Sequence, residues 1–358
     1  MKKVTFFIAI CFCIVLNTTA QKYPFIPDSL TLLPLKVLFE NPPPANVDLV
    51  YYEDGTRTTF KEVFPLVMQR KLMPHMFVDK DGNYRALVVA KIDVGTTRQV
   101  TINYPDIPES LKNYGYSFGN PASDAVIIHT QIGPLTNLLT EEFKKIFTNV
   151  GGVDTSSYFV INIHQFQTMH PEKLSENEVS FEQAKNYNKV STKMLYELAS
   201  YFKSHEKTVY IVGLSFGAFA GIDCIAEYGP LVDGYLLMVG RLDMTETIWK
   251  SFSEGVEATF EEDAITVKIG QKPEKTSSIN LNKIAAGYGF NRYSERLQDT
   301  DLSKLIYYFG KKDQSVGKLT ESEIELLENN GATVVGFNGG HNQTLDYLRE
   351  ALQKLLQQ

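Results

Sequence analysis

The sequence predicts an α/β fold built on a mostly parallel sheet with helices on its faces. After Asn120-Pro121, short apolar segments alternate with longer stretches of helical periodicity, which is typical of parallel strands joined by crossover helices. Each apolar segment is nearly continuous, as expected for a strand covered on both faces. One of them runs directly into Gly213-Leu214-Ser215-Phe216-Gly217, a strand-to-helix junction with a serine at its centre. The six expected strands are residues 125–129, 158–163, 208–212, 234–239, 305–309 and 333–337.

The first twenty residues are typical of a secretory signal peptide. Met1-Lys2-Lys3 precedes an apolar stretch at residues 4–16, and small residues lead to Ala20, after which we expect cleavage. An uncleaved membrane anchor is the alternative, but about 13 apolar residues are fewer than the ~20 that span a bilayer. We therefore expect a secreted or periplasmic protein whose mature chain has no transmembrane anchor.

Cysteine content and net charge exclude two properties, an intrachain disulfide and the binding of nucleic acid. Cys11 and Cys13 lie within the signal peptide, so the mature chain keeps only Cys224 and has no intrachain disulfide. The formal net charge of −7 becomes −9 when Lys2 and Lys3 are removed, because residues 1–20 contain no acidic residue. A net acidic chain without a basic cluster is a poor binder of nucleic acid.

The region that follows the signal, residues 21–83, is expected to be an N-terminal extension. Residues 21–46 are rich in proline and predict an extended arm or linker. Short β segments with Asp-Gly turns at Asp54-Gly55 and Asp81-Gly82 come next. Residues 84–91 and 98–104 are predicted to form two antiparallel strands, and we place residues 84–358 in the main domain.

The main domain contains a long helix and a long insertion. Ser180, followed three residues later by Gln183, forms a capping-box pattern that predicts the start of the helix. Residues 241–300 are too long and too polar for a single crossover, and we expect them to form an insertion that caps a substrate pocket. The alternative is a solvated excursion that contacts no ligand.

The serine at the junction is a candidate nucleophile, with partners that follow later strands. A serine hydroxyl is a weak nucleophile, so it needs a base and a group that orients the base. His341 directly follows the last strand, and Asp313 directly follows the strand before it. Both loops open at the carboxyl edge of a parallel sheet, where ligands bind. We assign Ser215 as nucleophile, His341 as base and Asp313 as the orienting acid, with Asp243 as the rival acid.

Cleavage through a serine also requires donors for the negative oxygen of the tetrahedral intermediate. The backbone N–H of Phe216, the residue after the nucleophile, is one expected donor. The second is expected from the loop at residues 129–134, and we assign it to the N–H of Gln131. This chemistry requires no metal and no organic cofactor.

The junction at Ser215 together with Asp313 and His341 resembles the α/β-hydrolase family, over roughly residues 84–358. The resemblance rests on the chain order nucleophile, acid, histidine. It implies an α/β-hydrolase fold with an eight-stranded, mostly parallel sheet and an inserted cap. Gly-Leu-Ser-Phe-Gly-Ala and the loop ending in Ile-Gly-Pro are most similar to the esterase and proline-iminopeptidase-like branches. Thr130 departs from the pattern, since many members have a glycine after the histidine.

These features favour a secreted serine hydrolase that cleaves an ester or amide bond through an acyl-enzyme intermediate. The expected substrate is a small-molecule ester or amide, including a short peptide. An aminopeptidase-like activity is an alternative, in which the acidic residues of the insertion attract an amino terminus. Acyl transfer to an alcohol would use the same three side chains. A non-catalytic binding protein on the same fold is the alternative outside the enzymes. The acidic residues concerned are Glu257, Glu261, Glu262 and Asp263.

Overall fold

The computed structural model describes residues 23–33, 47, 49–68, 72–91 and 100–357. The expected signal peptide, its cleavage position and the Pro42-Pro43-Pro44 run lie outside these residues. The chain divides into two compact units, Met1–Arg98 and Gln99–Gln358, here called the N-terminal and C-terminal units. None of the described helices is long and apolar enough to cross a membrane.

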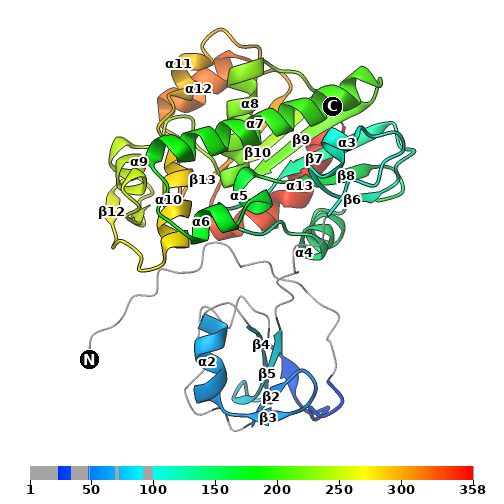
Figure 1. Ribbon diagram of the computed structural model, residues 1–358, viewed down its shortest axis with the longest axis vertical. Coiled ribbons are helices and arrows are strands. Elements are labelled where there is room, and N and C mark those ends of the chain that lie inside the picture. The colour runs from blue at the N-terminus through cyan, green and yellow to red at the C-terminus, as the bar shows by residue number, and fades with distance from the viewer. Residues whose placement is uncertain (1–22, 34–46, 48, 69–71, 92–99, 358) are drawn as a thin grey trace. The chain divides into compact units, whose positions relative to one another are not determined.

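The described residues of the N-terminal unit form a five-stranded sheet in the order β1-β4-β5-β2-β3 and the helix α2 (Figure 1). Strand β2 is parallel to β5, and the other neighbours are antiparallel. Val63 of α2 packs with Val50 and Leu87 in one apolar cluster, while Tyr23 and Ile26 pack in a second cluster. The elements are β1 (Thr31–Leu32), β2 (Leu49–Tyr52), β3 (Arg57–Thr58), α2 (Phe60–Met68), β4 (Leu72–Val78) and β5 (Tyr84–Lys91).

Three sequence-based expectations for this region are wrong. The segment 84–91 forms β5, which pairs with β4 and β2, so the boundary lies at Arg98 and not at residue 83. In the segment 98–104, the described residues form no strand, and the N–H of Ile102 donates instead to the carbonyl of Lys112 at 2.7 Å. The start of the proline-rich arm is not extended away from the unit, because Tyr23 and Ile26 are buried in its core.

The C-terminal unit contains the predicted mostly parallel sheet. Its strand order is β14-β13-β10-β9-β7-β8-β6, and every neighbouring pair is parallel except β6 with β8. The six predicted strands are confirmed, with ends within two residues of those expected. Strand β6 was not predicted. Among the described residues this sheet has seven strands, where eight were expected. The strands are β6 (Gly115–Gly119), β7 (Ala125–Thr130), β8 (Phe159–Ile163), β9 (Thr208–Leu214), β10 (Gly234–Met238), β13 (Leu305–Gly310) and β14 (Thr333–Phe337).

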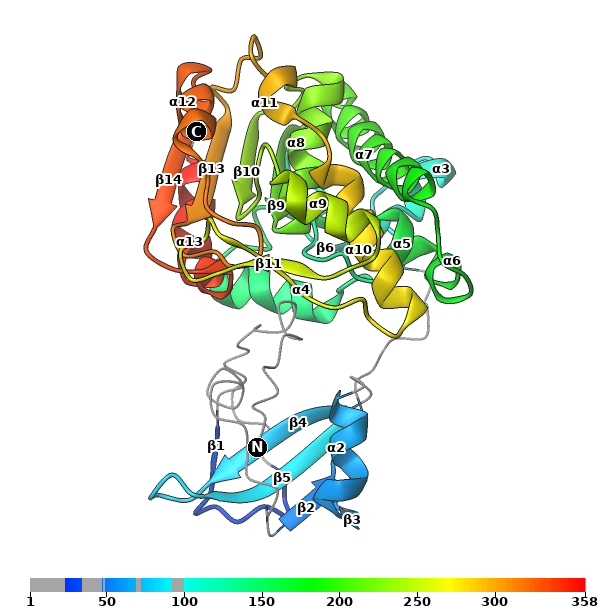
Figure 2. The same cartoon turned by 90° about the vertical axis from the view of Figure 1, so that its left-hand side faces the viewer.

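Helices cover both faces of this sheet, as the continuous apolar strands require (Figure 2). On one face, α7 (Phe181–Ser204) packs on α8 (Phe216–Tyr228), and both contact β9. On the other, α13 (Thr344–Leu356) packs on β10, β13 and the π-helical turn Ile146–Val150 that continues α4 (Glu141–Lys145). The predicted capping box is present, since Ser180 Oγ accepts from the Gln183 N–H and Gln183 Oε1 accepts from the Ser180 N–H.

Between β10 and β13 the chain forms two helices, a β-hairpin and a short third helix. Helix α10 packs on α7, α8 and α9. Tyr288 at the end of α10 and Tyr293 of α11 are buried, and the hydroxyl of Tyr293 donates to Asp223 of α8 at 3.1 Å. The hairpin contacts the loop after β13, where the Phe260 N–H donates to Gln314 O at 2.7 Å. These elements are α9 (Glu246–Ser253), β11 (Ala258–Phe260), β12 (Val267–Ile269), α10 (Thr276–Gly289) and α11 (Tyr293–Arg296).

The packing of Tyr23 generates a prediction for the N-terminal unit. Tyr23→Ala removes a buried ring that contacts Phe77, and it also removes the hydroxyl that shares a hydrogen bond with His75 Nδ1. We therefore expect the free energy of unfolding of this unit to fall by about 3 kcal/mol. Hydrogen exchange of the β4 and β5 amides in the full chain measures this loss. Asp81→Ala, on an exposed turn, is the control and should leave these exchange rates unchanged. Equal protection of β5 in the two variants would contradict the prediction.

Candidate active site

Ser215 lies at a sharp turn between β9 and α8. Its backbone has φ 55° and ψ −119°, a strained conformation for a residue with a side chain. Hydrogen bonds fix this conformation, since the Ser215 N–H donates to Met238 O and the Ala218 N–H donates to Ser215 O, both at 2.9 Å. The serine side chain is thereby presented at the carboxyl edge of the sheet.

The two glycines of the turn are required by close backbone contacts. A Cβ atom on Gly217 would lie 1.9 Å from the carbonyl oxygen of Thr130, and one on Gly213 would lie 2.4 Å from the carbonyl oxygen of Gly217. Contacts this short cannot be relieved by rotating a side chain, because both partners are backbone atoms. The sequence pattern therefore reflects the space between β7, β9 and α8.

The structure brings the three predicted side chains together. His341, at the start of the 3-10 turn after β14, has Nε2 at 2.9 Å from Ser215 Oγ and Nδ1 at 2.7 Å from Asp313 Oδ2. A carboxylate only accepts hydrogen bonds, so with Asp313 ionised Nδ1 carries the proton and Nε2 accepts from the serine hydroxyl. Asp313 has no exposed surface, and its other oxygen accepts from the N–H groups of Ser315 at 2.8 Å and Val316 at 3.1 Å.

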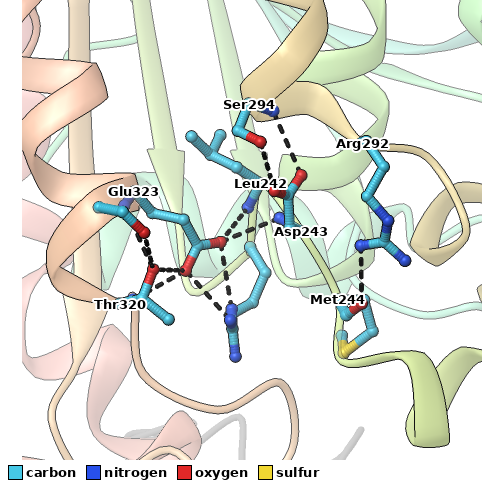
Figure 3. Close-up of polar contacts among 9 residues, drawn as sticks. Leu242, Asp243, Met244, Arg292, Ser294, Thr320 and Glu323 are labelled. Carbon is cyan, nitrogen blue, oxygen red and sulfur yellow. Dashed lines mark hydrogen bonds and ion pairs between the residues drawn. The ribbon is translucent and has the colours of Figure 1, made fainter.

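The rival acid, Asp243, has other partners (Figure 3). Its carboxylate accepts from the backbone N–H of Ser294 at 3.2 Å and also from the Ser294 hydroxyl. Its backbone pairs with Arg292 in an isolated bridge. Asp243 therefore attaches the loop after β10 to α11, and Asp313 is the carboxylate that contacts His341.

A buried ion pair holds the loop that follows β10. Arg241 Nη2 lies 3.1 Å from Glu323 Oε2, and both side chains are almost fully buried. Glu323 also accepts from the N–H groups of Leu242 at 3.0 Å and Asp243 at 2.9 Å, as well as from the Thr320 N–H at 2.7 Å (Figure 3). Sequence reasoning missed this pair, because nothing in the pattern around either residue indicates a partner so far along the chain.

Two other histidines near this edge are structural. His129 Nδ1 donates to Asn162 Oδ1 at 2.8 Å, and its ring stacks on Phe143. His164 Nδ1 lies 2.8 Å from the hydroxyl oxygen of Thr168. Burial lowers the pKa of each imidazole to about 4, so both are neutral at neutral pH. Neither has the contact with Ser215 Oγ that His341 makes.

The loop after β7 lies against the serine turn. Gln131 O would be 2.9 Å from a Cβ atom on Gly217, and Phe216 begins α8 directly after Ser215. The two predicted oxyanion donors thus belong to segments in contact. Ser215 is 9% exposed, Phe216 is 4% exposed and Gln131 has no exposed surface, so these three residues are buried, whereas residues 132–134 of the same loop are half-buried.

Other chemistry-bearing groups do not compete with this site. Among the described residues, no three His, Cys, Asp or Glu side chains are grouped so that they could hold a metal ion. Cys224 is buried on α8, and burial raises the pKa of its thiol to about 12. The thiol is therefore protonated at neutral pH and is a poor nucleophile.

Comparison with known proteins gives structural likenesses only. Neither a family model nor a curated protein matches the sequence. The chain is similar to a thioesterase domain from the curacin biosynthetic pathway (13% identity, 67% of this chain and 93% of that chain, TM-score 0.41). It is also similar to a lipase-esterase related protein from Clostridium acetobutylicum (13%, 68% and 98%, TM-score 0.42) and to a marine microorganism esterase (14%, 68% and 98%, TM-score 0.38). At these low identities and scores, the fold assignment rests on the strand order and the serine turn of this chain.

The close contact at Gly217 generates a prediction. Gly217→Ala forces the carbonyl of Thr130 away from α8, so we expect a loss of about 3 kcal/mol of stability. Gly229→Ala is the comparison: a Cβ atom there meets nothing within 4 Å, but its φ of +79° with ψ of 173° is a conformation that only glycine adopts readily, so about 1 to 3 kcal/mol of backbone strain is expected without any steric contact. Thermal unfolding of the two full-length variants compares them. A Gly217→Ala variant as stable as wild type would contradict the contact.

Proposed function

The C-terminal unit has the α/β-hydrolase fold, and we propose that the chain is a secreted or periplasmic serine hydrolase that cleaves an ester or amide bond. The observation that carries this proposal is that His341 contacts both other side chains, with Nδ1 at 2.7 Å from Oδ2 of buried Asp313 and Nε2 at 2.9 Å from Ser215 Oγ. A neutral imidazole held between a carboxylate and a serine hydroxyl is the arrangement that activates a serine. The proposed substrate is a small-molecule ester or amide, including a short peptide.

The reaction follows from the positions of these atoms. Ser215 Oγ attacks the carbonyl carbon while its proton moves to His341 Nε2, and Asp313 stabilises the resulting imidazolium. The N–H groups of Phe216 and Gln131 are the proposed donors to the oxyanion. His341 then protonates the leaving group, and the acyl-enzyme is hydrolysed by a water that loses its proton to the same nitrogen.

The alternatives receive less support. The acidic residues proposed to attract an amino terminus include Glu261, Glu262 and Asp263, which are exposed, and Asp263 accepts hydrogen bonds from Thr266 within its own turn. A binding protein on this fold would not need an intact acid, base and hydroxyl. Transfer of the acyl group to an alcohol would use the same three residues, and product analysis with a competing alcohol distinguishes it from hydrolysis.

Replacing the nucleophile tests the proposal. We expect Ser215→Ala to reduce hydrolysis of a generic aryl ester by roughly 10⁴-fold or more, because no other group takes the place of the attacking oxygen. The wild-type protein should also form a covalent adduct with a fluorophosphonate at Ser215, detected by mass spectrometry of the labelled peptide. Unchanged turnover in the variant, or an adduct at another residue, would rule out Ser215 as nucleophile.

The choice of acid is tested with a matched pair of variants. Asp313→Asn removes the carboxylate that holds the Nδ1 proton of His341, and we expect kcat to fall by roughly 10³- to 10⁴-fold. Asp243→Asn changes a carboxylate that contacts Ser294 instead, so kcat should stay within about tenfold of wild type. Steady-state kinetics on the same ester compares the two. The reverse ranking would assign the acid to Asp243.

A further inference from the structure

Thr130 occupies the space that the two glycines of the serine turn leave open. It ends β7 and is 2% exposed. Its hydroxyl donates to Gly217 O at 2.7 Å and lies 2.9 Å from the position that a Cβ atom on Gly213 would take. Its carbonyl oxygen lies 1.9 Å from the position that a Cβ atom on Gly217 would take. The threonine thus joins β7 to both ends of the turn that carries Ser215.

The next residue, Gln131, is held by hydrogen bonds of its own. Gln131 Nε2 donates to Asn137 O and its Oε1 accepts from the Leu139 N–H, both at 2.9 Å. The carbonyl of Gln131 accepts from Gln165 Nε2, also at 2.9 Å. Asn162 Nδ2 donates to Leu139 O at 2.6 Å and so fixes the far end of the same loop. The peptide between Thr130 and Gln131 is therefore restrained on both sides.

We propose that Thr130 is a positioning residue, whose hydroxyl sets the distance between the nucleophile turn and the loop that carries the second oxyanion donor. This inference rests on the proposed hydrolase function. The donor N–H of Gln131 belongs to the peptide bond that Thr130 begins, so a shift of Thr130 relative to Gly217 moves that N–H relative to Ser215. A threonine at this position is thereby explained as part of the site.

The short distance between the Thr130 hydroxyl and Gly217 O allows the positioning role of Thr130 to be tested by substitution. An O–H···O contact of 2.7 Å is normal for a hydrogen bond, whereas a methyl carbon and an oxygen stay about 3.3 Å apart or more. Thr130→Val has the shape of threonine but places a methyl group against the Gly217 carbonyl. The loop must then move away from the turn by a fraction of an ångström, and displacements of about 1 Å cost roughly 100-fold in rate.

The experiment compares four full-length variants with wild type. We expect Thr130→Val to lower kcat on an aryl ester roughly 10- to 100-fold with KM within about threefold, since the loss falls on the transition state. Binding of an aryl trifluoromethyl ketone, whose tetrahedral adduct carries an oxyanion, should weaken in parallel. Thr130→Ser keeps the hydroxyl and should stay within about threefold of wild type, whereas Thr130→Ala should be slower than Thr130→Ser.

Ser123→Ala is the matched control at the other end of β7. Ser123 is also buried, and its hydroxyl donates to Ser157 O, so the variant loses a comparable hydrogen bond. It should lower Tm without changing kcat.

Three outcomes would overturn the inference. Wild-type kcat in Thr130→Val overturns the positioning role and leaves the hydrolase proposal intact. If Thr130→Val does not fold, equal kcat in Thr130→Ser and Thr130→Ala overturns it in the same way. A wild-type protein that neither hydrolyses esters nor forms a fluorophosphonate adduct at Ser215 overturns the proposed function, and the inference falls with it.

Discussion

The close approach of β7, β9 and α8 is the constraint on which the rest of the site depends. Strand β9 turns into α8 at a single residue, Ser215, and the turn leaves no space for side chains on Gly213 or Gly217. This crowding has two consequences. It directs the serine hydroxyl out of the carboxyl edge of the sheet, and it brings the loop after β7 into contact with the first turn of α8. A wider turn would separate Ser215, the proposed nucleophile, from the backbone N–H groups proposed to stabilise the oxyanion.

Parallel pairing supplies the remaining groups at the same edge. Because β10, β13 and β14 run in the same direction as β9, the loops that follow them open beside Ser215. Asp313 and His341 come from the neighbouring strands β13 and β14, which allows the 2.7 Å contact between them. The loop after β10 could have supplied a carboxylate as well. It is instead fixed by the ion pair of Arg241 with Glu323, and Asp243 is used to attach α11.

The sequence predicted the structure correctly where a local pattern alone determines the position of a strand or a side chain. Continuous apolar runs marked the strands of the parallel core, and chain order identified Ser215, Asp313 and His341 as the side chains that meet. Prediction failed where the pairing of a strand or the burial of a side chain depends on a residue far along the chain. Residues 84–91 were identified as a strand, but their sequence does not say which sheet they join. On α7, Val190 lies three residues after Tyr187 and four before Met194, a spacing that predicts one apolar helix face, yet it is 44% exposed. Asn188 is buried instead, because its amide donates to Ile284 O of α10.

The region between β10 and β13 is anchored to α8, the helix that directly follows Ser215. Asp223 of α8 accepts from Thr192 of α7 at 2.7 Å, from Tyr293 at 3.1 Å and from Arg296 at 3.2 Å. Burial raises the pKa of the Asp223 carboxyl, while these hydrogen bonds and the guanidinium oppose that rise by favouring its charged form. A buried carboxylate with this many partners is costly to separate from them, because each would be left unpaired. Helix α11 is therefore attached to α8 through Asp223, and α10 is attached to the first turn of α8, where the ring of Tyr288 lies 5.1 Å from that of Phe216.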